Sequence, residues 1–200
     1  MGQTYLESGE PSAALRPLAR AIGKKSRIVS SAAVLGLALS HALTGDNIKA
    51  IRVLENSRTS TESRHASLDD MLSAYLRYRT SPTSGRRFQL EENLREVLYG
   101  QALDMATTYL VGQAYRELGQ HHQMVNLYEK AVDFVRGPLA VRMTFELAEY
   151  FDLIDARKEA RSRYLAVSAV DANGLGGKAQ LALADLAARD GKGTECLARC

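Results

Sequence analysis

A pattern of small and large residues recurs along this 200-residue chain at intervals of 34 to 36 residues. In the clearest copy, Gly112 follows the apolar Val111, the aromatic Tyr115 comes three residues later, and Gly119 stands where a turn is expected. A second series of small and large residues then follows: Met124, Leu127, Tyr128 and Ala131. Repeats of this length are typical of stacked helical hairpins, because a single hairpin cannot bury its apolar face alone.

Further copies cover most of the chain. Gly36 follows Gly2 by 34 residues (36 − 2). Leu147 and Leu183 continue the unit around Val111 at two steps of 36 (147 − 111 and 183 − 147). A copy around residues 72–97 is the poorest, because its expected turn at residues 81–85 is longer than the others. The spacing therefore predicts consecutive hairpins along the whole chain.

In their order of apolar, small and aromatic residues, glycine turn and second helix, these units resemble the tetratricopeptide repeat. The resemblance implies an all-α fold, a right-handed α-solenoid of stacked antiparallel helical hairpins. Residues 1–200 would form one such domain of about five to six repeats, the first and last incomplete. We therefore expect a segment of a longer protein, whose uncapped ends leave oligomerisation open.

The repeat pattern has a physical cause. Two helices approach closely only where a small residue faces a large one, so we expect Gly112 against Tyr128 and Ala148 against Tyr164. A left-handed glycine ends a helix at little cost. This predicts the following turn residues: Gly9, Gly45, Gly119 and Gly191.

Composition narrows the function classes. Ala, Leu, Arg and Glu are abundant and favour helix, whereas tryptophan is absent. The formal charge of +3 is too small for a strong long-range field, so nucleic acid is not an expected partner. No apolar stretch has the length a bilayer requires, which predicts no membrane insertion. The two cysteines both lie in the last five residues, which excludes a disulfide-built fold.

Two motifs could suggest chemistry. The glycine-rich residues 173–178 have Ala172 and Ala179 where a phosphate loop needs glycine and Ser or Thr, so we interpret them as a connector between repeats. His121 and His122 are expected in the turn of the fourth hairpin, where adjacent side chains diverge and a third metal ligand would have to come from elsewhere.

Other reactive residues also have simpler interpretations. Cys196 and Cys200 share one helix face but supply only half of a tetrahedral metal site, and a small buried residue is the simpler role for Cys196. Acidic clusters are expected on solvated helix faces: Asp69, Asp70, Glu91, Glu92 and Glu96. No catalytic or metal-ligand constellation emerges, so the sequence predicts no enzyme activity, no cofactor and no metal.

The long turn of the third hairpin is rich in arginine: Arg77, Arg79, Arg86 and Arg87. Such a patch can hold phosphates or an acidic peptide. The alternative is a solvated loop, because blocks of like charge normally stay hydrated.

The family resemblance also implies a binding groove lined by the second, fifth, ninth and twelfth residue of each repeat. In the second and third repeats these are Ser30, Ala33, Leu37, Ser40, Ser67, Asp70, Ala74 and Arg77. In the fourth and fifth they are Ala106, Tyr109, Gln113, Arg116, Arg142, Phe145, Glu149 and Asp152. From these we predict a partner-binding set: Tyr109, Gln113, Arg116, Arg142, Phe145, Glu149 and Arg77. Alternatively, Tyr109 and Phe145 pack between neighbouring hairpins.

The sequence thus favours a protein interaction scaffold or adaptor that binds a peptide or helix of a partner protein in the concave groove. Two alternatives stay open: an accessory or sensor domain of a larger multidomain protein, and an RNA-binding helical array. A cytoplasmic location is favoured, whereas a fragment of a longer chain leaves the periplasm or export open.

Overall fold

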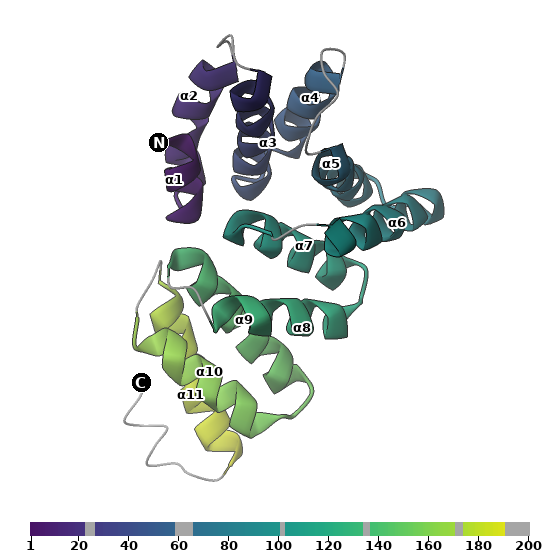
Figure 1. Ribbon diagram of the computed structural model, residues 1–200. Coiled ribbons are helices and arrows are strands. Elements are labelled where there is room, and N and C mark those ends of the chain that lie inside the picture. Colours follow the sequence, from purple (N-terminus) through teal and green to yellow (C-terminus); the bar gives the residue numbers. More distant parts are fainter. Residues whose placement is uncertain (23–26, 59–65, 101–102, 134–136, 171–173, 191–200) are drawn as a thin grey trace. The chain divides into compact units, whose positions relative to one another are not determined.

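The computed structural model describes residues 1–22, 27–58, 66–100, 103–133, 137–170 and 174–190. These residues form eleven α-helices and no β-strand, which confirms the all-α prediction (Figure 1). The helices are α1 (Gly2–Glu7), α2 (Pro11–Ile22), α3 (Arg27–Leu43), α4 (Asn47–Arg58), α5 (Ala66–Thr80), α6 (Ser84–Gly100), α7 (Met105–Glu117), α8 (His121–Val132), α9 (Pro138–Leu153), α10 (Arg157–Ser168) and α11 (Leu175–Arg189).

The predicted turn glycines adopt the left-handed conformation. The φ angle is +75° at Gly9, +86° at Gly45 and +75° at Gly119, which confirms these three turn positions. At the equivalent place after α9, Asp155 has a φ angle of +60° and is the one non-glycine residue with positive φ in the described ranges. Short polar side chains tolerate this conformation better than most. Gly191 lies outside the described residues.

The chain divides into two compact units, residues 1–119 and 120–200. The division falls in the turn of the fourth predicted hairpin, where the sequence shows no domain boundary. The expected contact of Gly112 with Tyr128 would join residues of different units. Both that contact and the single right-handed solenoid therefore stay predictions.

In the first unit, Leu18 of α2 packs into the space left by two glycines. A Cβ atom on Gly2 would lie 2.5 Å from Leu18 Cγ, and one on Gly36 would lie 3.2 Å from Leu18 Cδ2. Neither position has room for a side chain unless Leu18 moves. The small residues that set the 34-residue spacing are thus explained by close helix packing.

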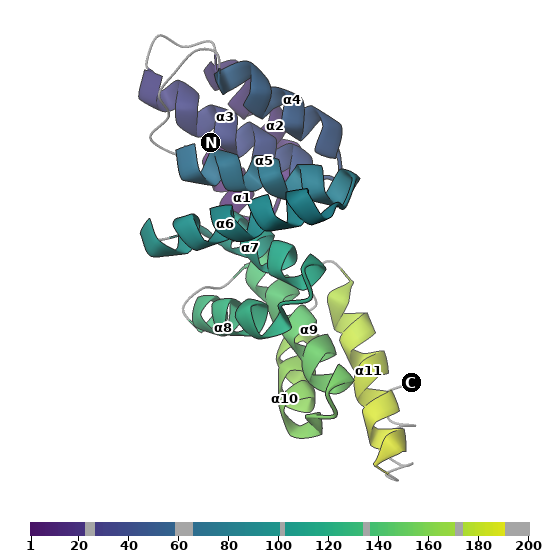
Figure 2. The ribbon, with the colours of Figure 1, turned by 90° about the vertical axis from the view of Figure 1, so that its right-hand side faces the viewer.

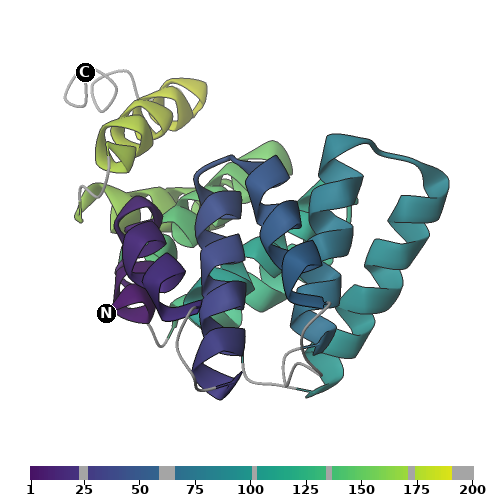
Figure 3. The ribbon, with the colours of Figure 1, turned by 90° about the horizontal axis from the view of Figure 1, so that it is seen from above.

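In the first unit, each of the helices α1 to α5 packs against the next one in sequence, and Figure 3 shows α3 to α6 following one another. The first helices of successive hairpins also touch, since α1 contacts α3, α3 contacts α5, and α5 contacts α7. In addition, α1 reaches α7, where the Gln3 amide donates to Asp104 Oδ2 at 3.4 Å. An extended solenoid has contacts only between adjacent repeats, so this last contact was not expected.

The second unit contains α8 to α11, in which α11 packs against both α9 and α10 (Figure 2). Its core consists of Ala148, Ala160, Tyr164, Val167, Ala179, Leu183 and Leu186. Ala148 and Tyr164 share this core, as the small-against-large pattern predicts. The Phe145 ring packs edge-on against Tyr164, with ring centroids 5.7 Å apart.

The predicted long turn of the third hairpin is wrong. Helix α5 ends at Thr80 and α6 begins at Ser84, so residues 84 and 85 are helical. Two contacts explain the short connection. Arg86 Nη1 donates to the carbonyl oxygens of Arg77 at 3.1 Å and Ser81 at 3.0 Å, which caps α5. The Thr83 hydroxyl accepts from the Arg86 backbone N–H at 3.3 Å at the start of α6.

Two other predicted connections are also helical. Gly174 has a φ angle of +73°, but α11 begins at the next residue, so residues 175–178 are not a connector. His121 and His122 open α8 instead of lying in the preceding turn. In both cases the small or polar residues occupy a first helical turn, where unpaired backbone N–H groups remain.

Candidate binding cleft

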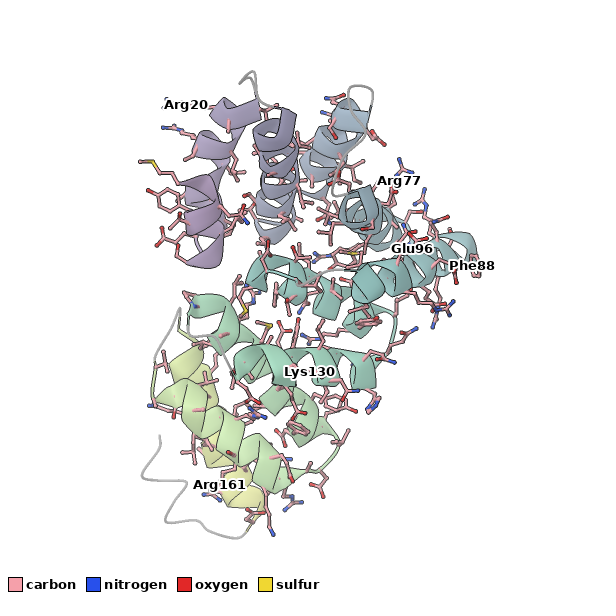
Figure 4. All side chains as sticks on the ribbon, in the orientation of Figure 1. Arg20, Arg77, Phe88, Glu96, Lys130 and Arg161 are labelled. Carbon is pink, nitrogen blue, oxygen red and sulfur yellow. The ribbon has the colours of Figure 1, made fainter. Side chains whose placement is uncertain are left out.

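A cleft of about 610 Å³ lies in the first unit, walled by α4, α5 and α6. Its lining is mostly polar: Glu55, Asp70, Ser73, Ala74, Arg77, Gly85, Arg86, Gln89 and Asn93. Figure 4 shows Arg77 projecting from α5. Volumes of this size are typical of sites that hold small molecules or a few side chains of a peptide.

An ion pair joins α4 to α5 at this cleft. Arg77 Nη2 lies 2.8 Å from Glu55 Oε1, and both side chains are nearly half exposed. Exposed ion pairs contribute little to stability, about 0 to 1 kcal/mol. The Arg77 guanidinium can therefore exchange Glu55 for another carboxylate at little cost.

Arg86 differs from the other arginines of the predicted basic patch. Its Nη1 is committed to the two carbonyl oxygens that end α5. Its Nη2 and Nε donate to no group within the described ranges, and no carboxylate there pairs with it. The guanidinium is thus positioned by one nitrogen while other N–H groups stay available.

The other three arginines each pair with a carboxylate. Besides the pair of Arg77, Arg79 lies 3.3 Å from Glu117, and Arg87 lies 3.1 Å from Glu91. Burial raises the pKa of Glu117, which also accepts a hydrogen bond from the buried Tyr75 hydroxyl at 3.3 Å. The patch predicted from sequence therefore presents far less positive charge than its four arginines suggest.

Two amide side chains line the α6 wall in a fixed order. Gln89 Nε2 donates to Asn93 Oδ1 at 2.9 Å, and Asn93 Nδ2 donates to the Asp70 carbonyl oxygen at 3.0 Å. Asn93 is only 8% exposed. This chain of hydrogen bonds orients the exposed Gln89 and leaves its carbonyl oxygen and one N–H for a ligand.

Ser73 is the least expected residue of the cleft. It is 3% exposed and lines the cleft, yet its hydroxyl makes no hydrogen bond among the residues the structure describes. Its Oγ does not belong to the fully buried polar atoms that lack a partner, so the hydroxyl reaches the open cleft and needs no ligand to satisfy it.

Of the predicted binding set, Arg77 lines this cleft. Three of the four groove positions of the third repeat line it, namely Asp70, Ala74 and Arg77. Asp69, expected on a solvated face, is instead 8% exposed. Four lining residues come from α5, four from α6 and one from α4, and because α4 and α6 are second helices the cleft differs from a groove made by first helices alone.

Other predicted positions in the first unit are buried. Ala33, Leu37 and Ser40 of α3 are 4%, 8% and 0% exposed, and Tyr109 of α7 is 5% exposed. Tyr109 lies near Tyr75 of α5. This burial favours the alternative in which Tyr109 packs between hairpins. Gln113 is partly buried and Arg116 is exposed on the same helix.

In the second unit, the predicted residues lie on α9. Phe145 is partly buried against the core, which again favours a packing role. Arg142 and Glu149 are exposed. Arg142 Nε lies 3.9 Å from Glu146 Oε1, a long contact for an ion pair. These residues belong to the second unit and the others to the first, so the single groove stays a prediction.

The histidines have local partners in the second unit. The His121 ring stacks on Tyr150 of α9 with centroids 5.5 Å apart, and His122 shares a hydrogen bond with Asn126. In the described part of the chain, no three His, Cys, Asp or Glu side chains gather as metal ligands. Cys196 and Cys200 lie outside it. No described helix has the length and apolar character to cross a bilayer.

Sequence reasoning missed the residues that give the cleft its chemistry. Glu55, Gln89 and Asn93 come from second helices, which the family resemblance assigns to the outer side. Ser73 stands in an apolar stretch and carried no motif. The sequence signal for this cleft was the segment 77–89, which is rich in arginine and small polar residues and contains no acidic residue.

Comparison with protein-family models, curated proteins and solved structures found no match. The tetratricopeptide resemblance is therefore neither supported nor contradicted by a relative.

Proposed function

We propose that this chain is a tetratricopeptide-type helical repeat protein that binds a peptide or helix of a partner protein and catalyses no reaction. The observation that carries this proposal is the polar cleft between α4, α5 and α6. Three of its lining residues occupy groove positions implied by the family resemblance, and one of them, Arg77, belongs to the predicted binding set. The all-helical hairpins and their left-handed turns are consistent with the repeat assignment.

The shape and lining of the cleft suit a peptide. It is bordered by helices whose exposed side chains carry both charges and amides, and such groups pair with the backbone and polar side chains of a bound segment. The exposed Phe88 stands on α6, one residue before Gln89 in sequence, and offers an apolar contact outside the cleft (Figure 4). A scaffold or adaptor role is part of the proposal.

A photo-crosslinking residue placed at Gln89 in the full chain tests this function. The control carries the same residue at Arg20, which is exposed on α2 and does not line the cleft. We expect one partner protein to be captured from Gln89 and not from Arg20. That protein, once purified, should bind the wild-type chain reversibly in calorimetry. Equal capture at both positions, or no binding by the purified protein, would refute the proposal.

A further inference from the structure

We infer that the exposed face of α2 binds the surface of an anionic lipid bilayer through Arg16 and Arg20. The inference goes beyond the proposed protein-binding function, because it concerns a different surface of the first unit and a different kind of partner. Its evidence is the positive charge that the sequence concentrates in one segment without any acidic residue.

The net charge of +3 conceals an uneven distribution along the chain. Residues 11–45 contain no acidic residue and five basic ones: Arg16, Arg20, Lys24, Lys25 and Arg27. The rest of the chain has 21 basic residues (26 − 5) against 23 acidic ones, which gives a formal charge of −2. The positive excess therefore lies in the segment that contains α2 and α3. Lys24 and Lys25 lie outside the described residues, so the site is defined by the two arginines of α2.

The two arginines share the solvent face of α2. Ala14 and Leu18 are the buried residues of this helix, and α2 packs against α1 and α3. Arg16 and Arg20 lie one turn apart on the opposite face and are exposed. Figure 4 shows Arg20 projecting from α2 on the side away from α3. The other exposed residues of this face are small, so that a flat surface can approach both guanidinium groups: Ser12, Ala13 and Ala19.

Neither arginine is neutralised within the described ranges, where no carboxylate pairs with Arg16 or Arg20. Several arginines of later helices do pair with carboxylates, for example Arg77, Arg157 and Arg189. Like charges one turn apart on a helix repel each other, so α2 keeps its two guanidinium groups at a cost to its own stability. A negatively charged surface would offset this repulsion, which makes the face complementary to an anionic partner.

The composition of the segment favours lipid headgroups over nucleic acid or an acidic protein. Residues 11–45 contain no Phe, Trp, Tyr, Asn or Gln. Aromatic side chains stack on unpaired bases, and amides read base edges, so both means of binding bases are missing. The exposed face of α2 also has no large apolar side chain, whereas the centre of a protein interface is rich in them. Anionic headgroups need neither, because they attract basic side chains by charge alone.

Cosedimentation of the full chain with vesicles tests this inference. The anionic vesicles contain phosphatidylcholine and phosphatidylserine, and the neutral vesicles contain phosphatidylcholine alone. We expect the chain to bind the anionic vesicles, to bind them more weakly as the salt concentration rises, and not to bind the neutral vesicles.

Paired variants of the full chain assign the binding to α2. Arg16→Gln with Arg20→Gln should weaken binding about 25-fold, because each basic side chain near an anionic membrane contributes about fivefold. Circular dichroism should show unchanged helicity, since both side chains are exposed. The matched control, Arg52→Gln with Arg95→Gln, removes the same charge from exposed positions of α4 and α6 and should weaken binding less than about threefold. Arg16→Lys with Arg20→Lys keeps both charges and should bind within about twofold of wild type.

Several results would overturn the inference. These are equal losses in the two glutamine pairs, equal binding to neutral and anionic vesicles, or a loss of binding in the lysine pair as large as in its glutamine counterpart. Oligouridylate and oligoglutamate with blocked ends are added as competitors, each at the same concentration of charge as the accessible lipid. If either displaces the chain from the anionic vesicles, the surface recognises nucleic acid or acidic protein and the lipid assignment is wrong.

Discussion

Because Leu18 packs against two glycines, the effect of Gly36→Ala on stability should change sign when Leu18 is replaced by alanine. In wild type, Gly36→Ala gains about 1 kcal/mol of helix propensity but places a Cβ atom 3.2 Å from Leu18 Cδ2 and 3.3 Å from Cδ1. Overpacking of a core costs about 1 to 3 kcal/mol, so the net cost is about 0 to 2 kcal/mol. Leu18→Ala alone removes a buried side chain and should cost about 2 to 5 kcal/mol.

In the Leu18→Ala background the close contact is gone, so Gly36→Ala should stabilise the protein by about 1 kcal/mol. The coupling energy between the two sites is then about 1 to 3 kcal/mol. Urea denaturation followed by circular dichroism measures it, and hydrogen exchange of α3 amides reports the first unit separately. Gly177→Ala, where no atom lies within 4 Å of the new Cβ, is the matched control and should not destabilise. Additivity within about 0.5 kcal/mol would refute the packing argument.

Three further predictions concern the cleft, the titration of a histidine and the predicted binding set. Glu55→Gln removes the exposed ion pair with Arg77 and should change the free energy of unfolding by less than about 1 kcal/mol in urea denaturation; a larger loss would contradict this. Burial lowers the pKa of His41 below its usual 6.5, so the folded state binds fewer protons than the unfolded chain as pH falls through 6.5. The free energy of unfolding of wild type should therefore decrease relative to His41→Gln between pH 7 and pH 5, and a constant difference in urea titrations would refute the shift. Tyr109→Ala should lower the free energy of unfolding by about 3 to 5 kcal/mol in the same assay. An unchanged midpoint of the urea transition would indicate that the Tyr109 side chain is exposed.

The sequence predicts the hairpins well because their signals are local. At a position with positive φ, such as Gly45, glycine is favoured by local sterics, independently of contacts elsewhere in the chain. The small residues Gly2 and Gly36 mark close helix contacts through the same steric rule. The length of the third hairpin's turn was predicted wrongly. The Arg86 side chain donates to the Arg77 carbonyl oxygen, nine residues earlier, and this contact closes the turn. Local sequence propensities do not encode such a contact.

The candidate site was harder to predict, because a surface position depends on what covers it. Groove positions carried over from a family assume that each first helix has an exposed face, yet residues 33–40 of α3 are buried without interruption. Their nearly continuous apolar sequence already argued for burial on all sides, since only an amphipathic helix leaves a face to solvent. Helix α5 is different, because its apolar run ends at residue 76 and basic residues follow in its last turn. The cleft forms where that polar end meets α4 and α6, so its lining depends on three helices at once and no single segment of the sequence shows it.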